Sequence, residues 1–216
     1  MPPTPHRDPD TTGWPWRWLA VAVAALTVAG CGAVTATTLI VPAGTPTTTT
    51  DPAAALIDKR VFVEGDSLTV GIAPYLPALL TAEGWDVTID AEVGRLTTTG
   101  LSMLAGRADE IGGTLVVALG TNDPPDPVAY AARIDEVMAL AAGRRVIWVG
   151  VARSGYDALD EALIAAQYRW SNLHVIDWRP IIAAHPDMRA ADGIHLTDAG
   201  YQLRAEVIAQ AIARGA

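Results

Sequence analysis

Short apolar runs alternate with longer helix-like stretches from residue 60 onward, and this alternation limits the fold more than any other feature. The runs are rich in Val and Ile and nearly continuous in apolar character, as are strands buried on both faces of a sheet. The expected strands are 60–64, 85–91, 114–119, 145–149 and 173–177, and the expected helices are 70–83, 99–108, 127–142, 158–168 and 198–214.

Strands that alternate with helices pair in parallel through right-handed crossovers. The sequence therefore predicts one three-layer α/β/α domain over residues 56–216. Half of the residues are hydrophobic, which is sufficient for a sizeable core. Ligands of such sheets bind beyond the carboxyl ends of the strands, so functional residues are expected there.

The charge and cysteine content exclude several kinds of function. The net charge is −9, and residues 51–216 carry all of it because two Arg and two Asp cancel in residues 1–50. An acidic domain disfavours nucleic acid and anionic membrane surfaces as partners. Cys31 is the single cysteine, so no internal disulfide can form, and no Cys/His cluster has zinc spacing. We therefore expect no metal and no other cofactor.

The N-terminal region predicts a membrane segment. Residues 1–17 form a polar, Pro-rich tail, and residues 18–41 contain no charge. A helix of that length would span about 36 Å, enough to cross a bilayer. Arg7 and Arg17 precede the span, which favours a cytoplasmic N-terminus and an outside C-terminus. One N-terminal transmembrane or signal helix is therefore expected.

Two other interpretations of this segment remain open. Residues 28–31, Val-Ala-Gly-Cys, resemble a bacterial lipobox with Cys31 as the lipidated residue, and a signal peptide could be cleaved near Ala36. The stretch after Cys31 stays apolar through Val41, which suits a spanning helix better. All three place the domain outside the cytoplasm, and residues 42–55 form a Thr/Pro-rich, extended linker.

A serine follows the first expected strand in the sequence Gly65-Asp66-Ser67-Leu68. Ser67 would open a helix, where free backbone N–H groups favour negative charge on a reacting acyl oxygen. Ser67 is therefore a candidate nucleophile. The alternative is that it only caps the helix.

A histidine near the C-terminus can supply the base. Of the four histidines, only His195 has an aspartate three residues before it in a short loop that leads to a helix. Asp192 can accept a hydrogen bond from one imidazole nitrogen and leave the other to face Ser67. The alternative is that Asp192-Gly193 is merely a turn.

Two further residues are candidates for binding a developing oxyanion. Asn122 follows strand 114–119, and its side-chain amide can donate to such an oxygen, unless it only forms an Asx-turn. Gly94 lets a backbone N–H approach a substrate closely, unless it is a loop glycine without a role. Position 69 is Thr, so the serine block is not the Gly-x-Ser-x-Gly elbow of α/β-hydrolases.

This set of residues resembles the SGNH hydrolase superfamily, also called the GDSL family. Its four blocks carry Ser, Gly, Asn and His in that order, with an Asp three residues before the His, and the resemblance covers about residues 58–214. It implies a flavodoxin-like, five-stranded parallel sheet in the order 2-1-3-4-5 and a serine hydrolase or acyltransferase mechanism without a metal. The matching positions are Ser67, Gly94, Asn122, His195 and Asp192.

Segments 90–95 and 192–197 are similar to extracytoplasmic SGNH domains attached to membrane acyltransferase-3 proteins, which resemble peptidoglycan O-acetyltransferase domains. The single hydrophobic segment of this chain cannot move an acyl donor across a membrane. Acyl transfer would therefore need a separate membrane protein to supply the donor.

These features together predict a membrane-tethered, extracytoplasmic serine esterase that acts on O-acetyl or short acyl esters of small molecules or cell-envelope glycans. Ser67 is the expected nucleophile, His195 its base and Asp192 the residue that orients the base. The N–H groups of Ser67 and Gly94 and the side chain of Asn122 would hold the oxyanion. Two alternatives remain: an O-acyltransferase to a sugar hydroxyl, and a non-catalytic carbohydrate-binding module that uses the same cleft.

Overall fold

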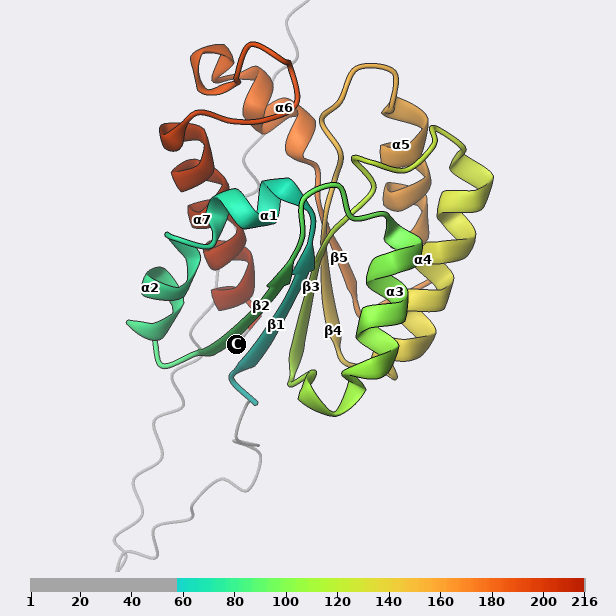
Figure 1. Ribbon diagram of the computed structural model, residues 1–216. Helices are drawn as coiled ribbons and strands as arrows, with labels where there is room; N and C mark the ends of the chain where they lie inside the picture. Colours follow the sequence, from blue (N-terminus) through green and yellow to red (C-terminus); the bar gives the residue numbers. More distant parts are fainter. Residues whose placement is uncertain (1–57, 216) are drawn as a thin grey trace, which may run out of the picture. The chain divides into compact units, whose positions relative to one another are not determined.

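A computed structural model describes residues 58–215, which contain a five-stranded sheet with helices on both faces (Figure 1). The order across the sheet is β2-β1-β3-β4-β5, and all neighbouring strands are parallel. The expected strands, their pairing and the order 2-1-3-4-5 are therefore confirmed. The strands are β1 (Arg60–Gly65), β2 (Asp86–Ala91), β3 (Thr114–Ala118), β4 (Arg145–Val149) and β5 (Leu173–Ile176).

The helices form two layers, as the α/β/α prediction requires (Figure 1). One layer contains α1 (Ser67–Ile72), α2 (Leu76–Thr81), α6 (Trp178–Ala183) and α7 (Asp198–Ala213), and the other contains α3 (Thr97–Gly106), α4 (Pro127–Ala141) and α5 (Asp157–Ala166). Two short 3-10 helices, η1 (Ala108–Glu110) and η2 (Pro186–Met188), lie in the connections.

Successive residues of the strands bury their side chains on opposite faces of the sheet. In β4, Trp148 packs on the layer of α3, α4 and α5, whereas Ile147 packs on the layer of α7. Trp148 meets Tyr130 edge to face, with ring centroids 5.9 Å apart. Burial on both faces makes the strands continuous apolar runs and fixes the positions of their carboxyl ends.

The expected helix 70–83 is two helices, and it begins earlier than expected. α1 starts at Ser67 and ends at Ile72, and α2 starts at Leu76. Pro74 lies between them, and because it has no N–H and its ring clashes with the preceding turn, it interrupts the helix. Pro77 lies in the first turn of α2, where proline is tolerated.

The short helix α6 was not expected. Asp177 caps it by accepting a hydrogen bond from the N–H of Arg179 at 3.2 Å. Trp178 and Ile182 bury one side of this helix against the sheet. Six residues with a proline among them give too little periodicity to indicate a helix.

The tail 1–17, the span 18–41 with Cys31, and the linker 42–55 lie outside the described residues. Among residues 58–215, no helix is both long enough and apolar enough to cross a membrane.

Candidate active site

Ser67 lies at the carboxyl end of the inner strand β1 and is the first residue of α1. Asp66 precedes it as the helix cap, and its carboxylate accepts a hydrogen bond from the N–H of Leu68 at 3.0 Å. The tight strand-to-helix turn needs glycine at position 65, because a Cβ there would overlap Oγ1 of Thr69. The turn leaves the half-buried Ser67 hydroxyl at the edge of the sheet.

Asp66 belongs to the serine block and has a structural role that its sequence position did not indicate. It is buried, and burial raises the pKa of its carboxyl above the usual value. Besides the N–H of Leu68, its carboxyl receives the side-chain amide of Asn122 at 3.4 Å. It therefore holds the serine turn against the loop that follows β3.

His195 and Asp192 lie beside Ser67 in the loop before α7. His195 Nε2 is 3.0 Å from Ser67 Oγ, and His195 Nδ1 is 2.6 Å from Asp192 Oδ2. The hydrogen bond from His195, and then the backbone N–H groups of Ile194 and His195, lower the pKa of Asp192 to about 2. An ionised Asp192 holds the tautomer of His195 that keeps Nε2 unprotonated toward the serine.

Further backbone contacts fix the histidine loop. Gly193 has a φ of 72°, a left-handed conformation that suits the turn after Asp192. Arg189 Nη1 donates to the carbonyls of Gly193 and Ala152, both at 2.7 Å, and so ties the loop to the segment after β4. The loop then enters α7, where the Thr197 side chain accepts from the N–H of Gly200.

Asn122 connects three loops at this edge of the sheet. Its Nδ2 donates to the carbonyl of Arg95 at 3.2 Å and, more weakly, to Asp66 Oδ2 at 3.4 Å. The neighbouring Asp123 accepts a hydrogen bond from the N–H of Thr97 at 2.9 Å. The loops after β1, β2 and β3 are therefore held together around Ser67.

Gly94 lies in an exposed turn directly before Arg95. Its φ is 80°, a left-handed conformation that favours glycine. A Cβ placed there would meet no atom within 4 Å, so close packing is not the reason for a glycine at this position. Within residues 58–215, neither the N–H of Gly94 nor that of Ser67 donates a hydrogen bond to another protein group.

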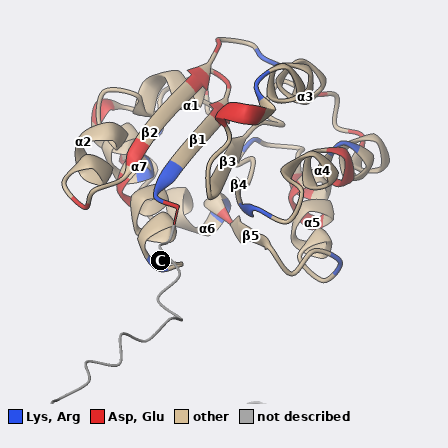
Figure 2. Ribbon diagram, turned by 90° about the horizontal axis from the view of Figure 1, so that it is seen from below, with Lys and Arg blue, Asp and Glu red and all other residues tan. Residues whose placement is uncertain are grey.

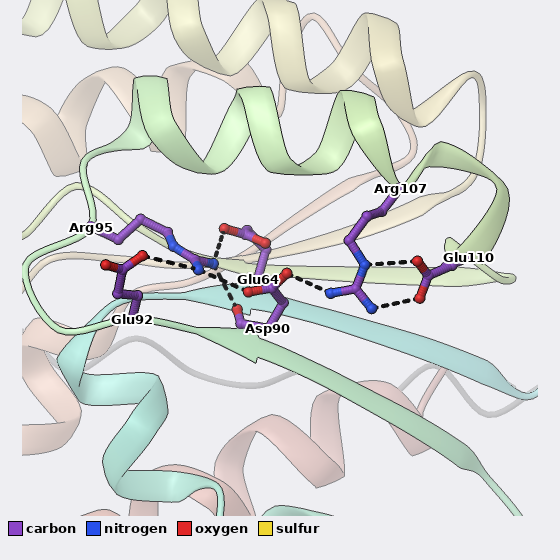
Figure 3. Close-up of polar contacts among 6 residues, drawn as sticks. All are labelled: Glu64, Asp90, Glu92, Arg95, Arg107 and Glu110. Carbon is purple, nitrogen blue, oxygen red and sulfur yellow. Dashed lines mark hydrogen bonds and ion pairs between the residues drawn. The ribbon is translucent and has the colours of Figure 1, made fainter.

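A buried ionic network supports the Gly94 turn (Figure 3). Arg95 Nη1 donates to Glu64 Oε1 at 2.5 Å and Nη2 donates to Asp90 Oδ1 at 2.8 Å. Glu64, on β1, is fully buried, and burial raises the pKa of its carboxyl to about 7 against the opposing effect of Arg95. Arg107 pairs with Asp90 and Glu110 farther out.

This network was not predicted from the sequence. The available signal was a glutamate that directly follows the apolar residues 61–63 and alternates with Phe62, which places it on an inward face of the strand. Helix α3 carries glycine where it crosses this carboxylate, since a Cβ at Gly100 would lie 2.9 Å from Glu64 Oε1. The described residues contain no group of three or more His, Cys, Asp or Glu side chains that could hold a metal.

The structure thus brings Ser67, His195 and Asp192 into one hydrogen-bonded chain, with Asn122 beside them through Asp66. Gly94 lies close to this group in the chain, because the carbonyl of the next residue, Arg95, accepts the hydrogen bond from Asn122. This arrangement can activate a hydroxyl group for attack on a carbonyl carbon.

The chain is similar in sequence to a known O-acetyltransferase. No protein-family model matches the chain. O-acetyltransferase OatA of Staphylococcus aureus is 28% identical over 152 residues, which cover 67% of this chain and 23% of that protein. The chain therefore corresponds to less than a quarter of the length of that relative.

Solved structures share the fold. The C-terminal catalytic domain of peptidoglycan O-acetyltransferase A from Streptococcus pneumoniae superposes with a TM-score of 0.59 at 23% identity, covering 73% of this chain and 93% of that one. The esterase EstA from Pseudoalteromonas sp. gives 0.60 at 13% identity, with 73% and 98% covered. A family 3 carbohydrate esterase from Clostridium thermocellum gives 0.58 at 13% identity, with 70% and 93% covered.

These proteins are esterases and O-acetyltransferases by name, which supports an enzyme of the hydrolase or acyltransferase class. Another structure with this fold is described as a lipolytic protein of the G-D-S-L family. In fold and in the order of its sequence blocks, the chain is therefore similar to the SGNH or GDSL superfamily, and in sequence to the O-acetyltransferase OatA.

Proposed function

We propose that residues 58–215 form a serine esterase that removes acetyl or other short acyl groups from hydroxyl groups of cell-envelope glycans or smaller esters. The observation that carries this proposal is the hydrogen-bonded chain from Ser67 through His195 to an ionised Asp192. It lies at the carboxyl edge of the parallel sheet, where ligands of such folds bind.

The first half-reaction forms an acyl-enzyme. Ser67 Oγ attacks the ester carbonyl carbon while His195 Nε2, 3.0 Å away, takes the hydroxyl proton. The carbonyl π bond becomes an oxyanion and then re-forms as the alcohol leaves. The bond between the acyl carbon and the leaving oxygen breaks as His195 gives its proton to that oxygen, so the acyl group remains on Ser67.

The second half-reaction restores the enzyme. A water molecule gives a proton to His195 Nε2 and attacks the acyl carbon. The bond to Ser67 Oγ then breaks, and the serine takes the proton back from His195. The products are the carboxylic acid and free enzyme, and Asp192 stabilises the imidazolium in both steps without accepting its proton.

The oxyanion would bind to three donors. The N–H groups of Ser67 and Gly94 have no partner among the described residues. The Asn122 amide donates to the Arg95 carbonyl and makes a longer bond to Asp66, and it can exchange the longer bond for a charged oxygen. Each donor strengthens its bond as negative charge develops, so the effect falls on the transition state.

A second candidate is acyl transfer, which the sequence match to OatA favours. The acyl-enzyme is the same, and a sugar hydroxyl replaces water in the second half-reaction. A separate membrane protein would then supply the acyl donor. Adding a glycan acceptor to an assay with an activated ester separates the two reactions, because transfer yields an O-acylated glycan.

We also propose that residues 18–41 hold the domain at the outer side of the cytoplasmic membrane and that linker 42–55 separates the two. The uncharged span and the arginines before it support this arrangement. The span is the proposed membrane contact of a domain whose own charge is unfavourable for an anionic surface.

The test of the proposed function is a panel of nitrophenyl esters, from acetyl to long acyl chains, assayed with the wild type and Ser67→Ala. We expect turnover that is highest for acetyl or short chains and absent in the variant. Labelling of Ser67 by a fluorophosphonate probe should depend on His195 in the same way. Equal turnover in both proteins would refute Ser67 as the nucleophile, whereas a wild type with neither turnover nor labelling would be a binding module and not an esterase.

A further inference from the structure

A groove beside the candidate active site contains several arginines. An inner apolar pocket is lined by residues that adjoin the site in sequence, Leu68 and Leu196 among them, and also by Ala152, Arg153 and Arg189. The last three residues also line an outer groove with a volume of about 280 Å³, together with Arg179 and Asp157. The inner pocket and the outer groove therefore meet at Arg153 and Arg189.

The three arginines differ in how their charge is balanced. Arg179 faces carboxylates of Asp177, Asp160 and Asp157 at 3.0, 3.4 and 3.5 Å. Arg153 and Arg189 form no ion pair with any carboxylate of residues 58–215. The domain is acidic, with Asp and Glu on both helical layers (Figure 2), and among its arginines without a carboxylate partner these two line both the inner pocket and the outer groove.

Both guanidinium groups are held in place by neutral groups. Arg153 Nη1 donates to the carbonyl of Thr121 at 2.7 Å, and its guanidinium lies 4.6 Å from the centre of the Tyr156 ring. Arg189 Nη1 donates to the carbonyls of Ala152 and Gly193. Thr121 directly precedes Asn122 in the chain, and Gly193 lies in the loop of His195, so both anchors belong to the loops of the candidate site.

Each arginine keeps unused donors. A guanidinium has five N–H groups, of which Arg153 uses one and Arg189 two in the bonds above. Within residues 58–215, none of the remaining nitrogens of these two arginines is buried without a partner, and both side chains line the groove. A planar donor pair in a fixed position is suited to a carboxylate or a phosphate, which it binds with two hydrogen bonds.

We propose that Arg153 and Arg189 form a subsite for an anionic substituent, a carboxylate or a phosphate, on the molecule that carries the ester. This inference rests on the proposed esterase function and specifies its substrate as an acidic glycan. The acyl group would lie at Ser67 while the acidic group of the same sugar, or of the next one, lies in the groove.

The first experiment compares O-acetylated methyl glucuronoside, the matching acetylated methyl glucoside and its 6-phosphate as substrates. We expect a higher kcat/KM for an anionic ester than for the neutral one. Arg153→Gln and Arg189→Gln should each lower that preference by about tenfold, the factor expected for one charge-assisted hydrogen bond. The ratio is the readout because a purely structural loss would lower all three rates together.

The matched control is Arg214→Gln. Arg214 is exposed at the end of α7. Arg145, the first residue of β4, donates to the last carbonyls of that helix, so the end of α7 lies at the amino ends of the strands, opposite the candidate site. The control removes the same charge from the domain and should leave the preference as it is. An equal fall in the control would mean that net charge, and not the subsite, sets the preference, and it would overturn the proposal.

The subsite is tested separately from catalysis by binding to the Ser67→Ala protein. Methyl glucuronoside or methyl glucoside 6-phosphate should bind more tightly than methyl glucoside in a titration followed by NMR, and Arg153→Gln should remove the difference. Absence of esterase activity with this preference intact would contradict the proposed function and support the subsite. Equal binding of all three sugars would overturn the proposed subsite for both the carboxylate and the phosphate.

Discussion

At the scale of single residues, the site combines two short local motifs that are distant from each other in sequence. The Asp192-x-x-His195 turn sets the geometry of its own carboxylate and imidazole, since Asp192 binds both the ring and the backbone N–H of His195. Ser67 gains its position from a separate turn, with the buried Asp66 as its cap. The contact between Ser67 and His195 then joins the two motifs.

Ser67→Ala and His195→Ala should each abolish ester turnover, whereas Asp192→Asn should leave a small residual activity. The nucleophile and the base act as one unit, while the orienting residue is partly replaceable. Steady-state rates with a nitrophenyl ester measure this. Circular dichroism provides the control for folding, and wild-type turnover in Ser67→Ala would refute the assignment of the nucleophile.

Asn122→Ala should lower kcat by about a hundredfold with little change in KM, the effect of removing one oxyanion donor. Its bonds to Arg95 and Asp66 also join loops, so the thermal midpoint must be measured in parallel. A variant that stays folded and keeps most of its turnover would show that Asn122 only shapes its loop. The oxyanion would then bind to backbone donors alone.

At the scale of elements, the loops after β1, β2 and β3 are tied together by buried polar groups. Arg95 is the centre of this arrangement, because its guanidinium binds Glu64 and Asp90 while its carbonyl receives Asn122. A buried carboxylate that is ion-paired on one side has a large effect on stability when either partner changes. The network therefore makes the turn at Gly94 a fixed part of the domain.

The stability of the domain should depend on pH through Glu64. The pKa of this carboxyl is raised from 4.5 to about 7 by burial, so the folded state binds its proton more tightly than the unfolded state. Its contribution to the free energy of unfolding is fully present below about pH 4.5 and is lost as pH rises through about 7. Glutamine cannot titrate, so the stability of the wild type relative to Glu64→Gln should fall over that range.

Urea unfolding of the two proteins at several pH values between about 5 and about 8 measures this difference, and groups that titrate in both proteins cancel. Glu161→Gln, at an exposed position of α5, is the matched control and should show a difference that stays constant. A wild-type advantage that grows as pH rises would mean that Arg95 keeps Glu64 ionised, contrary to this expectation.

At the scale of the whole molecule, residues 58–215 have their own core on both faces of the sheet. The segments before them differ in composition, with an uncharged span and a linker of threonines and prolines that has no apolar pattern of its own. A domain of this kind should fold without the preceding residues.

A truncated protein of residues 51–216 should be soluble, folded and active, whereas the full chain should fractionate with membranes. Ester turnover and a cooperative unfolding transition test the truncated form. Loss of either would refute the independence of the domain. Cys31→Ala distinguishes the modes of attachment, since release from the membrane would favour a lipid anchor over a spanning helix.

Local patterns in the sequence were sufficient to predict the fold class and the candidate site. Continuous apolar strands alternating with helices favour an α/β domain with a parallel sheet, and such a sheet gathers the loops after its strands at one end. Ser67, Asn122 and the pair Asp192 and His195 could be found because each lies in a short motif next to an element boundary. Periodicity and turn chemistry are local properties, and local properties can be read from a sequence.

The long-range polar contacts could not be predicted in the same way, because they depend on the tertiary arrangement of strands and loops. Glu64 meets Arg95 across 31 positions, and Arg153 meets the carbonyl of Thr121 across 32, so no local pattern joins them. Whether a charge is buried with a partner or left open to a ligand depends on which strands and loops become neighbours. That is why the apolar pattern indicated the sheet, while the ionic support of the Gly94 turn and the unpaired arginines beside the site became visible only in three dimensions.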